Sequence, residues 1–216
     1  FPSHVEFDAL STGRLVRVHL PIPGGFSIYN ALAALSAGLC LGLGLKEMAR
    51  VMPAVHGVKG RVEVVPVPPA YTVIIDYAHS PNALENILTT ARDFTAGRLI
   101  CLFGCGGDRD KTKRPIMGAI AQDLADVVVV TSDNPRTEDP QAIITDILSG
   151  MEGELEKVHV EPDRPAAIGW ALSQGQLGDV IVLAGKGHET EQEIGTQRVH
   201  LDEREEIASF FQQNTL

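Results

Sequence analysis

Four short apolar segments of the sequence are each followed directly by a polar or glycine-rich loop. The loops are residues 76–81, 104–109, 133–136 and 185–189. The runs at 73–75 and 127–130 are continuously apolar, which is typical of parallel strands covered on both faces. Because parallel strands end at one edge of a sheet, we expect the loops to converge where open α/β sheets bind ligands.

The alternation of apolar runs with helical patterns predicts a Rossmann-like, doubly wound α/β fold with a mostly parallel sheet in residues 61–216. Ser80-Pro81 and Asp139-Pro140 each place a capping residue before a proline, which favours a helix start. Asp202 and Glu205 resemble a capping box. Helices are predicted at 28–43 and 46–52, and strands at 14–20, 61–67, 72–76, 98–103, 127–131, 157–160 and 179–184.

Charge and composition exclude several classes of partner. The formal net charge of −10 argues against nucleic acid, whose phosphates the average field would repel. The longest apolar-rich stretch, residues 31–45, is too short to cross a bilayer, so we expect no membrane partner. Three irregularly spaced cysteines give no disulfide framework, and no histidine spacing predicts a metal ligand set. We expect a cytoplasmic monomer.

Arg136 is the residue that most directly suggests a ligand. It ends the tetrapeptide Asp133-Asn134-Pro135-Arg136, which follows the apolar run 127–131. A guanidinium group is a planar fork that matches a carboxylate with two hydrogen bonds, and the Asn-Pro pair turns the chain sharply. The sequence therefore predicts a carboxylate-reading amino-acid site.

Six short motifs occur in order along the sequence: YNALAA at 29–34, GVKGR at 57–61, DYAHSP at 76–81, GGDRDK at 106–111, DNPR at 133–136 and GKGHE at 185–189. Together they resemble the Mur ligase family, specifically its members that add meso-diaminopimelate. One local departure is Phe26-Ser27, where the family usually has Phe-Asn.

The resemblance implies an ATP-dependent ligase of peptidoglycan synthesis that uses Mg²⁺. It would join meso-diaminopimelate to a UDP-N-acetylmuramoyl-dipeptide through an acyl phosphate. Residues 1–60 would be the C-terminal part of the central ATP-binding domain, and residues 61–216 the C-terminal amino-acid-binding domain. The sequence contains no Gly-x-x-x-x-Gly-Lys-Ser/Thr phosphate loop. We therefore expect part of a longer enzyme, inactive by itself, with Mg²⁺ held mostly elsewhere.

Two sets of binding residues follow from the resemblance. In the ATP site, Asn30 and Arg61 would contact the adenine end and Asp76 the ribose hydroxyls. In the meso-diaminopimelate site, Arg109 and Arg136 would face carboxylates, while Asp133, Asn134 and Pro135 would shape the pocket, the first two binding ammonium groups. Gly185 and Glu189 would hold the distal amino-acid centre.

Selectivity for diaminopimelate over lysine would depend on Arg136. Diaminopimelate carries a carboxylate at its far end that lysine lacks, so lysine would leave the buried arginine unpaired. No general base is assigned, although His79 is a candidate.

Two alternatives remain at this point. The chain could be a fragment of another ligase of the superfamily, such as a lysine-adding, folylpolyglutamate or cyanophycin synthetase. It could also be a stand-alone amino-acid-binding module, which would account for the missing phosphate loop.

Overall fold

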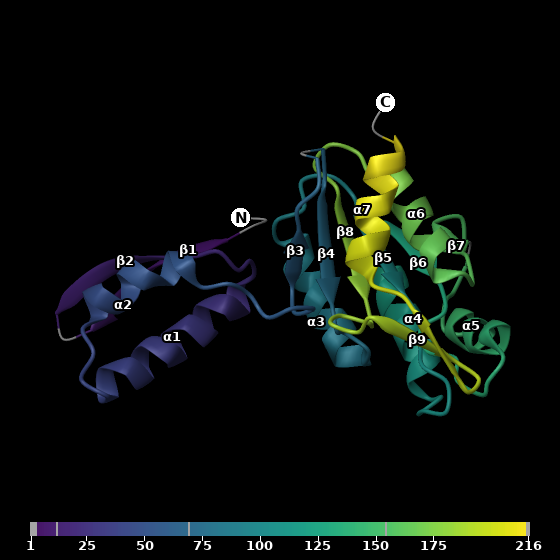
Figure 1. Cartoon of the computed structure of the whole chain (residues 1–216), viewed down its shortest axis with the longest axis horizontal. Helices are drawn as coiled ribbons and strands as arrows, with labels where there is room; N and C mark the ends of the chain where they lie inside the picture. The colour runs from purple at the N-terminus through teal and green to yellow at the C-terminus, as the bar shows by residue number, and fades with distance from the viewer. Residues whose placement is uncertain (1–3, 12, 69, 154, 215–216) are drawn as a thin grey trace. The chain divides into compact units, whose positions relative to one another are not determined.

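The computed structural model describes residues 4–11, 13–68, 70–153 and 155–214 (Figure 1). The chain divides into two compact units, residues 1–58 and 59–216. No helix in the described ranges is both long and apolar enough to cross a membrane.

The first unit packs two helices and a short 3-10 turn on a β-hairpin. Strands β1 (Val5–Ser11) and β2 (Arg14–Leu20) pair antiparallel, with Val5 opposite Leu20. Helices α1 (Gly25–Cys40) and α2 (Leu45–Val51) and the turn η1 (Met52–Ala54) follow. Buried residues shared by hairpin and helices form a small core, which contains Ala9, Val18, Leu35, Leu45 and Ala49.

The sequence predicted β2 and both helices of this unit but not β1. Helix α1 also ends earlier than predicted, at Cys40. Gly42 adopts φ +83°, a left-handed conformation that ends helices, and the Leu43 amide donates back to the Gly38 carbonyl at 2.9 Å.

The second unit is built on a six-stranded sheet with the order β3-β4-β8-β5-β6-β7. Only the edge strand β3 runs antiparallel to its neighbour; the other pairs are parallel. The predicted strand at 61–67 is reduced to three residues. The strands are β3 (Glu63–Val65), β4 (Thr72–Asp76), β5 (Leu99–Phe103), β6 (Val127–Val130), β7 (Val158–Val160) and β8 (Val180–Ala184).

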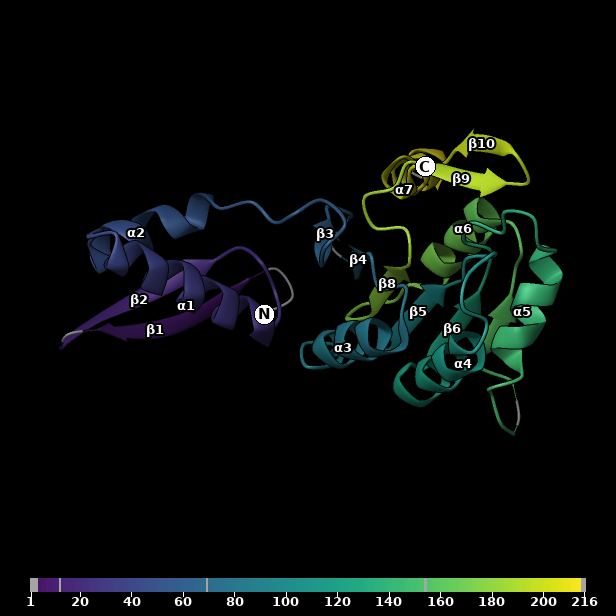
Figure 2. The same cartoon turned by 90° about the horizontal axis from the view of Figure 1, so that it is seen from below.

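Helices cover both faces of this sheet (Figure 2). One face packs on α3 (Pro81–Arg92), α4 (Lys113–Leu124) and α5 (Pro140–Leu148), with fully buried Leu84, Met117 and Ile144. The other packs on α6 (Arg164–Gln174) and α7 (Glu203–Asn214). This arrangement confirms the predicted doubly wound α/β fold, and buried strands such as β6 are apolar on both faces for that reason.

The C-terminal region contains a second hairpin that the sequence did not predict. Strands β9 (Glu191–Ile194) and β10 (Gln197–His200) pair antiparallel and precede α7. Asp202 caps α7 by accepting the Arg204 amide at 3.0 Å, while the Glu205 carboxylate contacts His200 Nε2 at 2.7 Å instead of completing a capping box. Asp139 caps α5 as predicted, accepting the Gln141 amide at 3.0 Å.

Candidate functional site

A cavity of 280 Å³ lies at the carboxyl ends of four adjacent parallel strands. All four loops singled out in the sequence contribute to it. Its lining includes Tyr77 and His79 after β4, Gly104–Gly106 and Arg109 after β5, Asp133, Asn134 and Arg136 after β6, and Gly185 and Glu189 after β8. A second cavity of 340 Å³ shares Asn134, Arg136 and Glu189 and is otherwise lined by His188, Thr190, Glu191, Glu193 and Arg198.

Glycine allows two of these loops to approach closely. A Cβ on Gly104 would lie 2.3 Å from the Thr131 carbonyl oxygen, which is backbone and has little freedom to move. Gly185 adopts φ +116°, and a Cβ there would lie 3.3 Å from Asp133 Oδ2. The small residues therefore bring the loops after β5 and β8 against the loop after β6.

Arg136 is held in an unusual conformation at the rim. Its φ is +51°, a region that costs roughly 1–2 kcal/mol for a residue with a Cβ. The neighbouring hairpin fixes this backbone, because the Arg136 amide donates to the Glu193 carbonyl at 3.0 Å and the Arg136 carbonyl accepts from Gly195 at 2.7 Å. The hairpin thereby orients the arginine.

The guanidinium group of Arg136 is already paired. Its Nε lies 2.8 Å from Glu193 Oε2, and its Nη1 donates to the Gly107 carbonyl at 2.9 Å. Glu193 in turn lies 3.4 Å from Arg198. No sequence pattern singled out Glu193, which is one of several charged residues in a polar segment.

The side chains of Asn134 and Glu189 line both cavities and contact each other. Asn134 Nδ2 donates to Glu189 Oε2 at 2.9 Å, and Asn134 Oδ1 accepts from the Glu193 amide at 3.0 Å. Burial alone would raise the pKa of Glu189, but the Asn134 amide and the Lys186 ammonium group outweigh it and hold that pKa below its usual value. Glu189 is therefore ionised at neutral pH.

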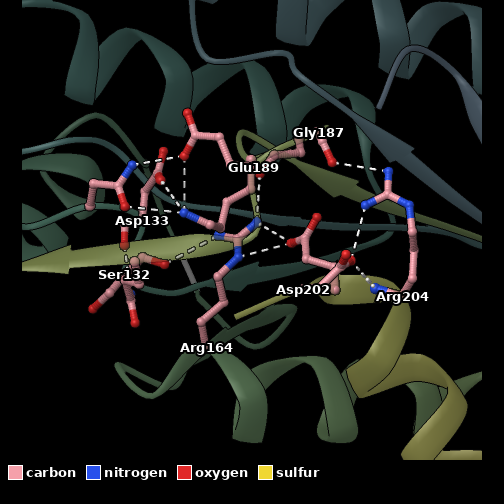
Figure 3. A network of polar contacts seen from close by, with 12 residues as sticks. Ser132, Asp133, Arg164, Gly187, Glu189, Asp202 and Arg204 are labelled. Atoms are coloured by element: carbon pink, nitrogen blue, oxygen red, sulfur yellow. Dashed lines mark hydrogen bonds and ion pairs between the residues drawn. The ribbon is translucent and has the colours of Figure 1, made fainter. Parts of the chain in front are cut away.

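Asp133 is a buried carboxylate beside this pair (Figure 3). Within the described part of the chain, its Oδ1 has no hydrogen-bond partner, and the Lys186 Nζ lies 3.8 Å away. A buried carboxylate oxygen without a donor favours a cationic ligand. The backbone of Asp133 is tied to the hairpin, since Gln192 Nε2 donates to its carbonyl at 2.6 Å.

Pro135 and Arg109 complete the predicted amino-acid set. Pro135 is buried and packs so closely on the loop after β5 that a Cβ on Gly107 would lie 1.9 Å from its carbonyl oxygen. Arg109 is exposed at the cavity, where its Nη1 donates only to the adjacent Asp108 carbonyl at 3.1 Å among the described residues. Of the two arginines, Arg109 is the less constrained.

Glu138 belongs to the loop after β6 and connects it to the loop after β5. It contacts fully buried Arg114 twice, Lys111 at 2.9 Å and the Asp108 amide at 2.7 Å. These contacts, the Arg114 guanidinium first among them, lower the pKa of Glu138 to about 2. The sequence did not single out either Arg114 or Glu138.

A buried ion pair lies next to the site, and its arginine, Arg164, is labelled in Figure 3. Arg164 and Glu203 are both completely buried and approach to 2.7 Å. Arg164 also donates to the carbonyls of Ser132 at 3.2 Å and Ala184 at 2.9 Å, which immediately precede Asp133 and Gly185. The pair therefore fixes the starting points of two site loops.

The predicted nucleotide residues are distributed over both units. Asn30 is exposed on α1 of the first unit, whereas Arg61 and Asp76 belong to the second. The Arg61 guanidinium carbon lies 4.9 Å from the centre of the Tyr77 ring. Asp76 is buried and accepts the Val62 amide at 2.8 Å; burial raises the pKa of its carboxyl despite this bond.

His79 is exposed at the cavity, and one contact indicates which of its ring nitrogens carries the hydrogen. Its Nδ1 lies 2.8 Å from the Tyr77 carbonyl oxygen, which can only accept. In the neutral ring Nδ1 therefore carries the hydrogen and Nε2 is left as the proton acceptor.

Two histidines that showed no ligand spacing in the sequence come together with a carboxylate. His4, Glu6 and His19 place one potential ligand atom each within 4.8 Å of one another. The unpredicted strand β1 explains this, because Glu6 pairs with His19 across the hairpin. The Glu6 carboxylate already has two partners, because His19 Nδ1 lies 3.2 Å from its Oε1 and Arg17 Nη1 lies 3.9 Å from its Oε2. We assign no metal to this cluster.

Comparison with known proteins connects this site to a family. Residues 60–187 match the family described as Mur ligase, glutamate ligase domain. Two relatives are UDP-N-acetylmuramoyl-L-alanyl-D-glutamate--2,6-diaminopimelate ligases. The relative from Synechococcus elongatus is 54% identical, and the match covers 86% of this chain and 37% of the relative. The relative from Clostridioides difficile is 48% identical, and the match covers 87% of this chain and 39% of the relative.

A solved structure of a protein with that same name superposes with a TM-score of 0.77 and 38% sequence identity. The alignment covers 98% of this chain and 43% of the solved one. This chain thus spans about two fifths of the relatives' length. Because the family match covers more than half of the chain, including all four loops except the last residues of the fourth, this chain belongs to the Mur ligase family.

Proposed function

We propose that this chain supplies the amino-acid site and part of the ATP site of an ATP-dependent amide-bond ligase. The complete enzyme would add meso-diaminopimelate to UDP-N-acetylmuramoyl-L-alanyl-D-glutamate in peptidoglycan synthesis. The names of the matched relatives support this substrate pair. We keep the two-domain interpretation, with a boundary at residue 60, as part of the proposal.

The observation that carries the proposal is the charge pattern of the cavity. Arg109 and Arg136 line it together with Asp133 and Glu189. Each end of meso-diaminopimelate is a zwitterion, so a site for it needs cationic and anionic groups close together. A cavity lined by both cationic and anionic groups suits such a zwitterionic ligand better than it suits a ligand with a single charge.

One residue role changes from our expectation. We expected Asn134 to bind an ammonium group, but its oxygen already accepts from Lys186 at 3.1 Å and from the Glu193 amide at 3.0 Å. Asn134 can offer only an N–H, which suits a carboxylate. We therefore propose that Asn134 and the arginines bind carboxylates, while Asp133, Glu189 and the Gly185 region receive ammonium groups.

For ATP, we propose that Asn30 and Arg61 contact the adenine end and that Asp76 binds the ribose. Support for Asp76 is its position at the carboxyl end of β4, where α/β folds bind nucleotides. Mg²⁺, where bound, neutralises phosphate charge. We propose no ligand for it from this chain, whose contribution to the nucleotide is confined to base and ribose.

The proposed reaction activates the D-glutamyl carboxylate as an acyl phosphate, with ATP as the phosphoryl donor. The amino group of diaminopimelate then attacks the acyl carbon, phosphate leaves, and an amide forms. The attacking amine must first lose a proton. In this chain His79 Nε2 is a proton acceptor at the cavity, and its contribution stays a hypothesis.

Calorimetric titration with meso-diaminopimelate and with L-lysine tests the amino-acid site. The chain is expected to bind diaminopimelate only, and Arg136→Ala is expected to lose that binding. Arg92→Ala is the matched control, since Arg92 pairs with Asp126 at the surface outside both cavities. Equal binding of both amino acids, or undiminished binding by Arg136→Ala, would contradict the proposal.

A further inference from the structure

Lys186 is a completely buried lysine with three polar neighbours. Its Nζ lies 3.1 Å from Asn134 Oδ1, 3.1 Å from Glu189 Oε2 and 3.8 Å from Asp133 Oδ1. Burying an ammonium group is costly unless acceptors surround it, so these contacts are a requirement of the fold. All three acceptors belong to residues of the proposed amino-acid site.

The backbone explains why this lysine points inward. Gly185 and Gly187 on either side adopt φ +116° and +55°, conformations that favour glycine. A Cβ on Gly187 would also lie 2.7 Å from Tyr77 Cβ and 2.8 Å from the Gly60 carbonyl oxygen. The Gly-Lys-Gly sequence thus makes a tight turn that directs only the central side chain beneath the cavities.

The contacts of Lys186 determine what its neighbours present to a ligand. Asn134 Oδ1 is occupied, and one Nδ2 hydrogen is used by Glu189 at 2.9 Å. The second Nδ2 hydrogen has no acceptor in the described ranges of the chain and is a donor for a ligand. One ammonium group beside the two carboxylates of Asp133 and Glu189 leaves a net negative charge, which favours a ligand ammonium group.

We propose that Lys186 is a positioning residue that clamps Asn134 and Glu189 together and so sets the arrangement of donor and acceptor groups in the amino-acid site. The part that concerns meso-diaminopimelate rests on the proposed function. The clamp itself depends only on the contacts among Lys186, Asn134 and Glu189, and it is testable without any ligand.

Nuclear magnetic resonance of the unsubstituted chain is the first test. The Nζ hydrogens of Lys186 are expected to exchange slowly with water, because they are buried and hydrogen-bonded. The Nζ hydrogens of exposed Lys46 serve as the fast-exchanging reference. Fast exchange at Lys186 would overturn the proposal without any substitution, so a variant that fails to fold does not leave it undecided.

The second test compares Lys186→Met with Lys157→Met. Lys157 is the matched control, since its Nζ also binds acceptors, the carbonyls of Gln122 and Ala125, but does not contact the site. Carbon-detected titration is expected to show a higher pKa for Glu189 in Lys186→Met only. The side-chain amide signals of Asn134 are expected to shift in the same variant.

Ligand titration of the same variants gives the functional outcome. Lys186→Met is expected to bind meso-diaminopimelate roughly tenfold more weakly or worse, as expected when hydrogen bonds to a charged group are lost, and Lys157→Met to bind normally. Unchanged Asn134 and Glu189 signals in Lys186→Met would overturn the clamp. If those signals change while the unsubstituted chain binds no diaminopimelate, the clamp stands and the proposed function fails.

Discussion

Glu193 forms an ion pair with Arg136, in which Arg136 Nε lies 2.8 Å from Glu193 Oε2. The two side chains are 22% and 33% exposed, so the pair is accessible to a competing ligand. Arg136 therefore holds an internal carboxylate, and in the proposed site a ligand carboxylate would have to replace Glu193 or share the guanidinium group with it.

Glu193→Gln removes this competitor. We expect the affinity for meso-diaminopimelate to rise about fivefold, because a partly exposed ion pair contributes up to about 1 kcal/mol. Calorimetric titration measures the change, with Glu85→Gln as the control, since Glu85 is exposed on α3 and lines neither cavity. A lower affinity in Glu193→Gln would mean that Glu193 orients Arg136 and does not compete with the ligand.

Arg164→Met tests the buried ion pair next to the site. It leaves the Glu203 carboxylate buried without its partner, and we expect the free energy of unfolding to fall by about 3–5 kcal/mol. Arg92→Met breaks an ion pair with Asp126 in which both side chains are exposed, and it is expected to cost less than about 1 kcal/mol. Urea denaturation compares the two, and equal losses would argue against a central role for Arg164.

Two glycines give opposite expectations on substitution by alanine. Gly104→Ala places a Cβ 2.3 Å from the Thr131 carbonyl oxygen and is expected to destabilise the chain by about 1–3 kcal/mol. Gly169→Ala in α6 meets no atom within 4 Å among the described residues and is expected to stabilise it by about 0.5–1 kcal/mol. Thermal unfolding measures both changes in stability. A Gly104→Ala variant as stable as the unsubstituted chain would show that the loops are not tightly packed.

We expect Glu138 to stabilise the folded chain at neutral pH and to lose this contribution in acid. Its contacts, Arg114 first, hold its pKa at about 2 in the folded chain, below the ordinary value of 4.5. The folded state therefore favours the ionised carboxylate. Its contribution is complete above the ordinary pKa and is lost as the pH falls through 4.5 toward 2.

Glu138→Gln is expected to remove that part of the pH dependence. Urea denaturation between about pH 2 and pH 6 would then show a shallower loss of stability in Glu138→Gln than in the unsubstituted chain. Glu85→Gln, at an exposed position on α3, should leave the slope unchanged. Identical slopes in Glu138→Gln and the unsubstituted chain would refute the assignment.

The sequence predicted the sheet and the convergence of four loops, because local patterns encode both. Apolar runs such as 127–130 identify buried strands, and glycines and prolines identify the loops that follow them. It did not predict the hairpins. β9 is only four residues long, and its sequence, Glu-Gln-Glu-Ile, alternates too little for a strand signal.

The missed site residues have a common cause. Glu193 and Lys186 act through partners far away in the sequence: Glu193 is paired with Arg136, and Lys186 with Asn134. Charged residues in polar segments usually indicate a solvated surface, so single positions give no signal for such pairs. For Lys186, the glycines on either side of it were the one indication in the sequence that its side chain points inward.

The most direct test of the amino-acid site is a nuclear magnetic resonance titration of the chain with meso-diaminopimelate. We expect backbone amide signals to shift at residues 104–109, at Asp133, Asn134 and Arg136, at residues 185–189 and in the hairpin segment 191–195, while those of the first unit stay unchanged. Shifts confined to other parts of the chain, or binding that leaves the signals of Asn134, Arg136 and Glu189 unchanged, would contradict it.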